Sequence, residues 1–262
     1  MAGRKLKSPG RREFLAGSVA TVGALGTVRP GEAQGTPAGS AAGTSRRSYN
    51  GRYSGETLRR VAFPLGGMGA GMLCLEGTGA LSHVSLRHHP DVFNEPCVFA
   101  AVSVQGEPRL ARVLEGPVPS WKRFGLEGSG NGAGGRTWGL PRFGRASFLA
   151  RFPFGTVTLE DDTVPLKVEI TGWSPFEAGD PDASSLPFAA LEYRLQNPAA
   201  REVRGVFSWS ARNFMAVEKA DKAVRAILGG FVLWGAGPKD KPWEEGAFCA
   251  RTLDPKTRVN HA

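Results

Sequence analysis

Hydrophobic and polar residues alternate with a period of two along much of the chain. In a β-strand such alternation places every second side chain on the same face, so that one face can be buried and the other can stay in water. The clearest runs lie at 166–170 and 191–195, and the same spacing resumes between 203 and 209. The pattern therefore predicts strands rather than helices over these ranges.

Turn signals separate the predicted strands. Asp161-Asp162 and Asn197-Pro198 lie between alternating runs, and Gly229-Gly230 divides an apolar run at 224–234 into two strands. A helix over 213–228 is an alternative, since four apolar residues there have a helical spacing: Phe214, Val217, Val224 and Leu228. We favour strands throughout, and expect an all-β chain folded as a two-sheet antiparallel β-sandwich.

Composition agrees with this fold class. The 262 residues include 36 glycines and 19 prolines, which is typical of many strands joined by tight turns. The net charge of +9 divides between the first 35 residues, with six basic and two acidic side chains, and a remainder at +5. Basic residues in the remainder are scattered and do not alternate with aromatic ones. We therefore expect no nucleic-acid partner.

The first 35 residues have the pattern of an export signal. Arg11 and Arg12 precede Phe14-Leu15 and a mildly apolar run that is too short and too rich in small residues to cross a bilayer. Paired arginines in this setting are typical of the bacterial twin-arginine signal. We expect a signal peptide at 1–35, the twin-arginine machinery as a partner, and a periplasmic or extracellular location. A disordered basic tail is the alternative.

The rest of the chain divides by composition. Residues 36–58 are rich in Gly, Ser and Ala and predict a flexible linker, and 59–262 should form the folded domain. Six glycines in the segment from Leu126 to Gly139 indicate a surface loop. No segment has the length and apolar character of a transmembrane helix.

A glycine cluster at 66–71 precedes an apolar run. Its spacing does not match a dinucleotide-binding fingerprint, because Met72 occupies the third glycine position and the following residues predict a strand rather than a helix. We expect these glycines to let a strand bend, or to let two backbone segments approach closely.

The densest group of ionisable and amide side chains follows at once. It consists of His83, Arg87, His88, His89, Asp91, Asn94 and Glu95. Adjacent histidines on an extended chain point in opposite directions, so a shared metal ion is disfavoured. The three cysteines, Cys74, Cys97 and Cys249, have no zinc-site spacing either. We expect hydrogen bonding in a polar interface, with neither metal nor cofactor.

Three of the six tryptophans fall in segments bounded by glycine or proline: Trp121, Trp138 and Trp173. An exposed indole there could stack on a sugar ring, although packing in the core is the commoner use of tryptophan. These three residues are therefore candidates for sugar contact.

Several longer motifs resemble glycoside hydrolase family 116, the family of non-lysosomal glucosylceramidases and bacterial β-glucosidases. The motifs are FPLGGMGAG at 63–71, LEGTG at 75–79, SLRHHPDVFNEP at 85–96, ARVLEG at 111–116, GLPRF at 139–143, ARFPFG at 150–155, TGWSPF at 171–176 and ARNFM at 211–215. The resemblance covers about residues 60–262.

The resemblance implies an amino-terminal β-sandwich followed by a larger (α/α)₆ barrel that carries both catalytic carboxylates of a retaining β-glucosidase. Motifs for those carboxylates have no counterpart here, so no catalytic residue is assigned. We expect the chain to be the non-catalytic sandwich, incomplete at its carboxy-terminal end, whose substrate partner is a β-glucoside bound by the helical domain. His83, Arg87, His88, Asp91, Asn94 and Glu95 would then lie at the domain interface or at the rim of the sugar pocket.

Two other functions remain open. A stand-alone carbohydrate-binding sandwich would use Trp121, Trp138 or Trp173. A complete small glycosidase would need local carboxylates such as Glu76 and Glu95, and hydrolysis of an aryl β-glucoside by this chain would reveal it.

Overall fold

The structure, a computed structural model, describes residues 47–262 except 93, 107–108, 125–138, 255 and 261–262. Contacts divide the chain into two units, Met1–Ser45 and Arg46–Ala262. All the elements below belong to the second unit. Three of the candidate residues lie outside the described part, namely Arg11, Arg12 and Trp138, as does most of the glycine-rich segment.

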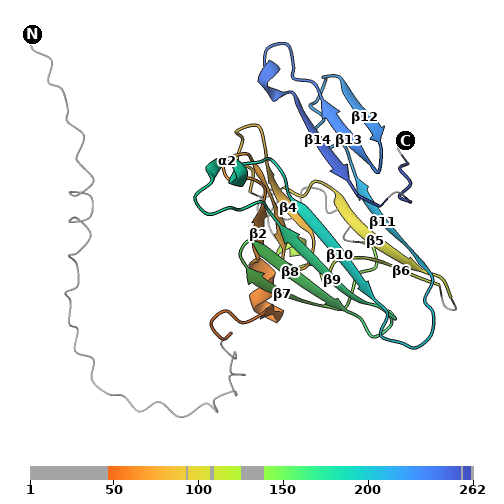
Figure 1. The fold of residues 1–262 in the computed structure, drawn as a ribbon. Helices are drawn as coiled ribbons and strands as arrows, with labels where there is room; N and C mark the ends of the chain where they lie inside the picture. The colour runs from red at the N-terminus through yellow and green to blue at the C-terminus, as the bar shows by residue number, and fades with distance from the viewer. Residues whose placement is uncertain (1–46, 93, 107–108, 125–138, 255, 261–262) are drawn as a thin grey trace, which may run out of the picture. The chain divides into compact units, whose positions relative to one another are not determined.

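Strands dominate the described chain (Figure 1). They are β1 (Tyr53–Ser54), β2 (Ala62–Leu65), β3 (Met72–Glu76), β4 (Leu81–Ser85), β5 (Val98–Val104), β6 (Leu110–Val113), β7 (Arg145–Arg151), β8 (Phe154–Glu160), β9 (Lys167–Trp173), β10 (Ala190–Gln196), β11 (Gly205–Ala211), β12 (Lys222–Ile227), β13 (Gly230–Gly235) and β14 (Gly246–Arg251). The helical segments are short: α1 (Ser120–Phe124), α2 (Pro181–Ser184) and the 3₁₀ turns η1 (Gly55–Arg60) and η2 (Pro242–Glu244).

Every pair of neighbouring strands is antiparallel. The largest sheet has the order β1-β7-β8-β9-β10, and three three-stranded sheets have the orders β2-β3-β4, β11-β5-β6 and β12-β13-β14. Burial along β8 and β9 alternates residue by residue, so one face of the five-stranded sheet is covered by the core. The prediction of an all-β sandwich is confirmed, with the hydrogen bonding divided among four sheets.

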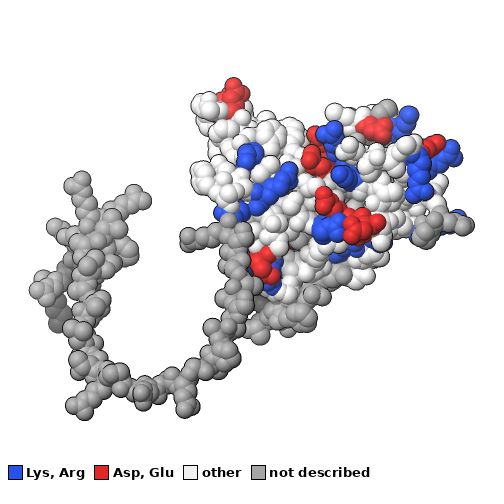
Figure 2. All heavy atoms as spheres, turned by 90° about the horizontal axis from the view of Figure 1, so that it is seen from below, with Lys and Arg blue, Asp and Glu red and all other residues white. Residues whose placement is uncertain are grey.

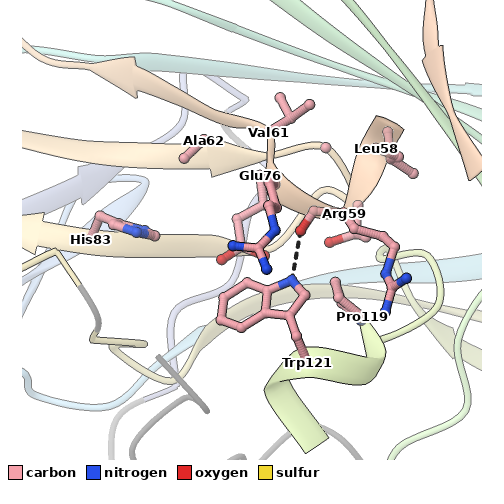
Figure 3. A pocket seen from close by; sticks show the side chains of 11 residues that line it. Leu58, Arg59, Val61, Ala62, Glu76, His83, Pro119 and Trp121 are labelled. Atoms are coloured by element: carbon pink, nitrogen blue, oxygen red, sulfur yellow. Dashed lines mark hydrogen bonds between the residues drawn. The ribbon is translucent and has the colours of Figure 1, made fainter. Parts of the chain in front are cut away.

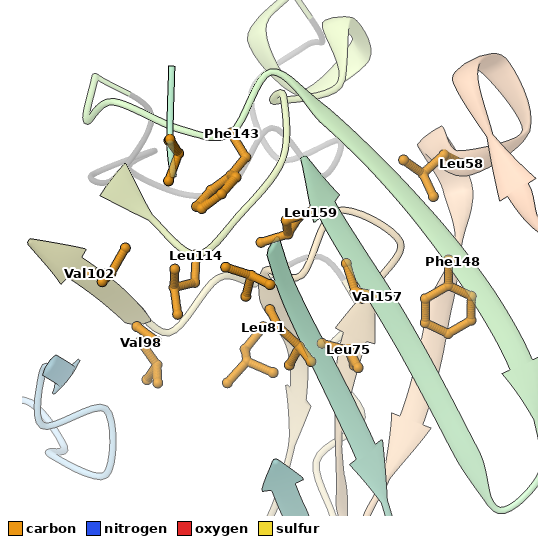
Figure 4. Packing of buried hydrophobic residues seen from close by; sticks show 14 of the residues in the cluster. Leu58, Leu75, Leu81, Val98, Val102, Leu114, Phe143, Phe148, Val157 and Leu159 are labelled. Atoms are coloured by element: carbon orange, nitrogen blue, oxygen red, sulfur yellow. The ribbon is translucent and has the colours of Figure 1, made fainter. Parts of the chain in front are cut away.

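The core lies between the five-stranded sheet and the strands β3, β4 and β5 (Figure 4). Val157 and Ile170 enter it from the five-stranded sheet, and Leu75 enters from β3; all three are fully buried. Phe148 packs edge-on against Tyr53 of β1, with ring centroids 6.2 Å apart. These contacts give the sheets a common apolar layer, as alternating strands require.

The fold begins earlier than the sequence indicated. Tyr53 and Ser54 pair with Phe148 and Ser147 of β7, and Leu58 is buried in the core. All three residues fall inside the range 36–58 that we expected to be a linker. Their few apolar side chains are too widely spaced to show a period in a Gly/Ser-rich context, which is why composition did not reveal them.

The strand predictions in the second half of the chain are confirmed. β8 and β9, β10 and β11, and β12 and β13 flank the turns expected near 161, 197 and 229. The helical alternative for 213–228 is wrong, since Lys222–Ile227 forms β12 and pairs in register with β13. The positive φ of 71° at Gly229 explains why glycine occupies this hairpin turn.

The glycine cluster acts as expected, through close backbone approach. A Cβ atom at Gly67 would lie 2.2 Å from the carbonyl oxygen of Leu186, and Met68 N–H donates to Ser184 O at 2.9 Å. A register shift between Met72 and Cys74 bends β3 against β4. The cluster therefore joins the β2–β3 connection to the segment around α2.

Charges on the surface are mixed in sign. Figure 2 shows Lys and Arg side chains beside Asp and Glu side chains on the face that it presents. Among residues of the described ranges, no helix is long and apolar enough to cross a bilayer.

Candidate functional site

The strand β4 and the segment that follows it have an unusual backbone. His83, Arg87, His88 and Cys97 all have φ between 53° and 57°, in the left-handed region that residues with a Cβ seldom adopt. In the described part of the chain only Asn50 and Lys219 share this feature among non-glycine residues. Such backbone persists only where surrounding contacts impose it.

Asn94 supplies much of that support. Its Oδ1 accepts from Val84 N–H at 2.7 Å and its Nδ2 donates to Val84 O at 2.9 Å. The side-chain amide thus makes the two backbone hydrogen bonds that a neighbouring strand would otherwise make. The backbone carbonyl of Asn94 also accepts from His83 N–H at 2.9 Å. Ser85 Oγ makes a similar pair of bonds with the backbone of Asp91, at 3.0 and 3.1 Å.

The remaining polar residues of the segment differ in exposure. Arg87 is half-buried and donates from Nη2 to Met215 O at 2.8 Å, tying the segment to the residues that precede β12. Asp91 is half-buried, whereas His88 and His89 are exposed. The imidazoles of His88 and His89 are therefore exposed on a backbone that the bonds of Ser85 and Asn94 hold in place.

Glu95 points to a different environment, a buried group of ions. Lys122 Nζ donates to Glu76 Oε1 and Oε2 at 2.6 and 2.8 Å, and also to Glu95 Oε1. The side chain of Lys122 is 4% exposed and that of Glu76 is 7% exposed. One ammonium group from α1 therefore holds two carboxylates from β3 and from the end of the 86–96 segment.

A second buried ion pair lies close to the first. Arg142 Nη2 is 3.0 Å from Glu115 Oε2, and both side chains are less than a tenth exposed. Burial raises the pKa of Glu115, Arg142 opposes this rise, and the nearby charges of Glu76 and Glu95 add to it; together with the lowering effect of Lys122 they leave the pKa at about 7. We name Glu76, Glu95, Glu115, Lys122 and Arg142 the ion cluster.

A small cavity adjoins the ion cluster between η1, β2, β3 and α1 (Figure 3). Its volume is about 170 Å³, and its walls include Glu76, Thr78, His83 and the indole of Trp121. Trp121 Nε1 donates to Arg59 O at 2.8 Å, which fixes the ring across the cavity. We name this space the Trp121 pocket.

The other sugar-contact candidate in the described chain, Trp173, lies elsewhere. Its ring is half-buried at the end of β9, with centroids 6.4 Å from Phe154 and 5.8 Å from Phe188. Phe154 and Phe188 are 46% and 50% exposed. The candidates therefore separate into one indole in a pocket and one in an open aromatic patch.

Comparison with known proteins identifies the family. The model described as "beta-glucosidase 2, glycosyl-hydrolase family 116 N-term" matches residues 62–231. The chain belongs to this family. No curated protein matches the chain.

The match confirms the resemblance to family 116, and it runs from the start of β2 to the start of β13. It includes the whole ion cluster and most of the residues that line the Trp121 pocket. The glycosyl-hydrolase family implies a carbohydrate substrate.

The ion cluster was only partly visible in the sequence of this family 116 chain. Glu95 belongs to the predicted polar group and Glu76 was weighed as a carboxylate, but Lys122, Glu115 and Arg142 were missed as site residues. Lys122 is 46 positions from Glu76 and 27 from Glu95. Neither spacing matches a helix or strand period, so the sequence did not indicate that these residues meet. A lysine directly after a tryptophan in a proline-bounded segment is only a weak indication of a site residue.

The described side chains of this family 116 chain offer no metal site, since no group of three or more His, Cys, Asp or Glu residues converges there. The predicted polar group is divided by the structure. Glu95 contacts the ion cluster, His83 lines the Trp121 pocket, and Asn94 and Arg87 bind backbone. His88 and Asp91 belong to the segment 86–96, which we name the strained loop.

Proposed function

We propose that this chain is the non-catalytic amino-terminal sandwich of an exported glycoside hydrolase of the β-glucosidase or glucosylceramidase type. The ion cluster is the observation that supports this most directly. Glycoside hydrolysis needs one carboxylate that attacks or activates water and another that transfers a proton at the scissile bond. The carboxylates gathered here are instead held in ion pairs with buried cations.

The geometry of Lys122 explains why Glu76 and Glu95 are unsuited to that chemistry. Each would have to leave a charge-assisted hydrogen bond with a buried ammonium before reacting with a sugar. Breaking a buried pair costs several kcal/mol, about 3–5. The reading of the chain as a complete small glycosidase is therefore disfavoured.

The strained loop supports a role in packing. His88, His89 and Val92 are exposed, and the backbone beneath them is held by Ser85 and Asn94. A surface fixed in advance loses little conformational freedom when a partner binds. We assign this surface to the contact with a separate helical catalytic domain, of the kind that the resemblance implies.

Two measurements test the proposal that the chain is a non-catalytic part of a larger enzyme: hydrolysis by the purified chain, and the intact mass of the native protein. The purified chain should release no nitrophenol from 4-nitrophenyl β-glucoside, and the native protein recovered from its source should have an intact mass far above 27.8 kDa. Turnover by the chain alone that is lost in Glu76→Gln would overturn the non-catalytic role. An intact mass slightly below 27.8 kDa would refute a covalently attached catalytic domain.

The loop contact is tested by a matched pair of exposed valines in the native protein. Val92→Ser removes an apolar side chain that is 45% exposed in the loop, and Val206→Ser removes one that is 57% exposed on β11. We expect only the first to reduce the melting cooperativity between domains and the rate of glucoside hydrolysis. Equal effects from both substitutions would reject the loop as the contact.

Export by the twin-arginine route is part of the same proposal, supported by Arg11 and Arg12 in the leader-like segment. Replacement of both by lysine keeps the charge and should leave the protein in the cytoplasmic fraction. Unchanged export of the Arg11→Lys, Arg12→Lys protein would contradict the route.

A second candidate function is carbohydrate binding by a free-standing sandwich, favoured by the aromatic patch of Trp173, Phe154 and Phe188. Exposed aromatic faces of this kind suit the apolar faces of sugar rings. Retention on insoluble β-glucan that is lost in Phe188→Ala and kept in Trp243→Ala, an exposed control at η2, would support it.

A further inference from the structure

We propose that the Trp121 pocket is a binding site for one neutral sugar ring, separate from any hydrolytic centre. The cavity volume of about 170 Å³ is below the range of about 300–1,000 Å³ that holds drug-sized ligands. A single ring or another small polar molecule is therefore the appropriate size class. The choice among such molecules follows from the chemistry of the walls.

Charge around the pocket is balanced. Arg59, Arg60 and Glu76 line it. Behind them, Glu56 pairs with Arg59, and Lys122 pairs with Glu76 and Glu95, so that these three cations and three carboxylates cancel. A small anion would meet the buried carboxylate of Glu76, and a small cation would meet the guanidinium of Arg60 beside the indole. The balance favours an uncharged ligand.

The polar walls offer both kinds of hydrogen bond. Glu76 provides carboxylate oxygens with further acceptor capacity beyond the bonds from Lys122, and Arg60 provides N–H donors. A sugar hydroxyl both donates and accepts, so neighbouring hydroxyls on one ring can use an acceptor and a donor at once. A purely apolar ligand would leave these groups without a partner.

Thr78 supplies an independent observation. It lines the pocket and is only 5% exposed as a residue. Its hydroxyl is not among the buried side-chain atoms that have no partner in the described chain, so it is open to the cavity and available for a hydrogen bond. A ligand hydroxyl in the pocket would form that bond.

The indole of Trp121 completes the site. Its ring is fixed by the bond from Nε1 to Arg59 O, and Arg60 Cζ and Lys122 Nζ each lie over the ring, 5.7 Å from its centroid. Leu58 and Pro119 extend the apolar wall. The C–H face of a sugar ring can pack on this wall while its hydroxyls reach Glu76, Thr78 and Arg60.

Binding can be measured on the whole chain by tryptophan fluorescence and by proton NMR saturation transfer. Methyl β-D-glucoside is the probe, with sodium gluconate and methylammonium chloride as charged comparisons. We expect saturable binding of the glucoside in the millimolar range and none of either ion. Absence of glucoside binding up to the solubility limit, or preferential binding of an ion, would overturn the proposal.

Thr78→Val is the decisive variant, because it removes one hydroxyl and keeps the shape of the side chain. It should weaken glucoside binding about three- to tenfold, the value of one hydrogen bond, and leave the melting temperature nearly unchanged. Thr163→Val, at an exposed turn outside the pocket, should not change binding. Equal affinity of wild type and Thr78→Val would assign any observed binding to another site, and would refute the pocket. Neither result depends on whether the chain is joined to a catalytic domain.

Discussion

Lys122 Nζ lies 2.6 and 2.8 Å from the two carboxylate oxygens of Glu76, in a place where water scarcely reaches either side chain. This contact joins α1 to β3, and through Glu95 it also anchors the strained loop that follows β4. A charge pair of this kind is costly to bury but more costly to break, since a single remaining charge has no solvent to stabilise it.

Removal of the ammonium should therefore destabilise the fold strongly. Lys122→Met keeps the length and apolar stem of the side chain but leaves Glu76 and Glu95 buried without a counter-charge. We expect a loss of about 3–5 kcal/mol in the free energy of unfolding, measured by urea denaturation. Lys239→Met, at an exposed position, is the matched control and should change stability by less than about 0.5 kcal/mol.

A compensating variant distinguishes the charge from the packing. Adding Glu76→Gln and Glu95→Gln to Lys122→Met removes all three charges, and part of the lost stability should return. If the triple variant is no more stable than Lys122→Met, the ammonium acts through packing and not through its charge.

Glu115 should make stability depend on pH near neutrality. Burial holds its pKa at about 7 in the folded chain, above the value of 4.5 that applies without burial. The folded state therefore binds the proton more tightly than the unfolded state, so the contribution is complete below about pH 4.5 and is lost as pH rises through 7. The size is on the order of 3 kcal/mol, from 1.36 kcal/mol per pKa unit.

Glu115→Gln tests this dependence, because glutamine copies the protonated carboxyl in shape and cannot ionise. Urea denaturation between pH 4.5 and 8 should show a falling free energy of unfolding for the wild type and a flatter profile for the variant. Asp161 behaves in the opposite way. Its pKa is lowered chiefly by the hydrogen bond from Thr163, so its contribution to stability is lost only as pH falls below this interval. A wild-type profile that rises over the same interval would contradict the assignment.

The amide of Asn94 should be required in full. Asn94→Asp retains the acceptor for Val84 N–H but loses the donor to Val84 O, so two oxygen atoms face each other in a half-buried setting. We expect a loss of about 1–3 kcal/mol and faster amide exchange at Val84. Asn197→Asp, in an exposed turn, is the control, and similar losses from both would show that Asn94 is not a special support.

Sequence reasoning recovered the strands because alternation is a local property. Val168 and Ile170 reveal their buried face within a few residues, and Gly229-Gly230 reveals its hairpin. The ion cluster could not be found in the same way, since Lys122 meets Glu76 only after β3 and α1 come together. Residues 53–58 were missed for a related reason: the pairing of Tyr53 with β7 depends on a partner strand almost a hundred residues away.

Close packing at the glycine cluster gives the last prediction. In Gly67→Ala the new methyl group would lie 2.2 Å from Leu186 O and 2.5 Å from the Ser185 carbonyl carbon, both backbone atoms that cannot rotate away. The β2–β3 connection and the segment after α2 must then separate, breaking the bond from Met68 N–H to Ser184 O. We expect a loss of about 1–3 kcal/mol, as for overpacking elsewhere. Gly139→Ala, whose methyl group would meet no atom of the described residues within 4 Å, should be nearly neutral. If thermal melting shows Gly67→Ala to be as stable as Gly139→Ala, the two segments do not pack as closely as the structure places them.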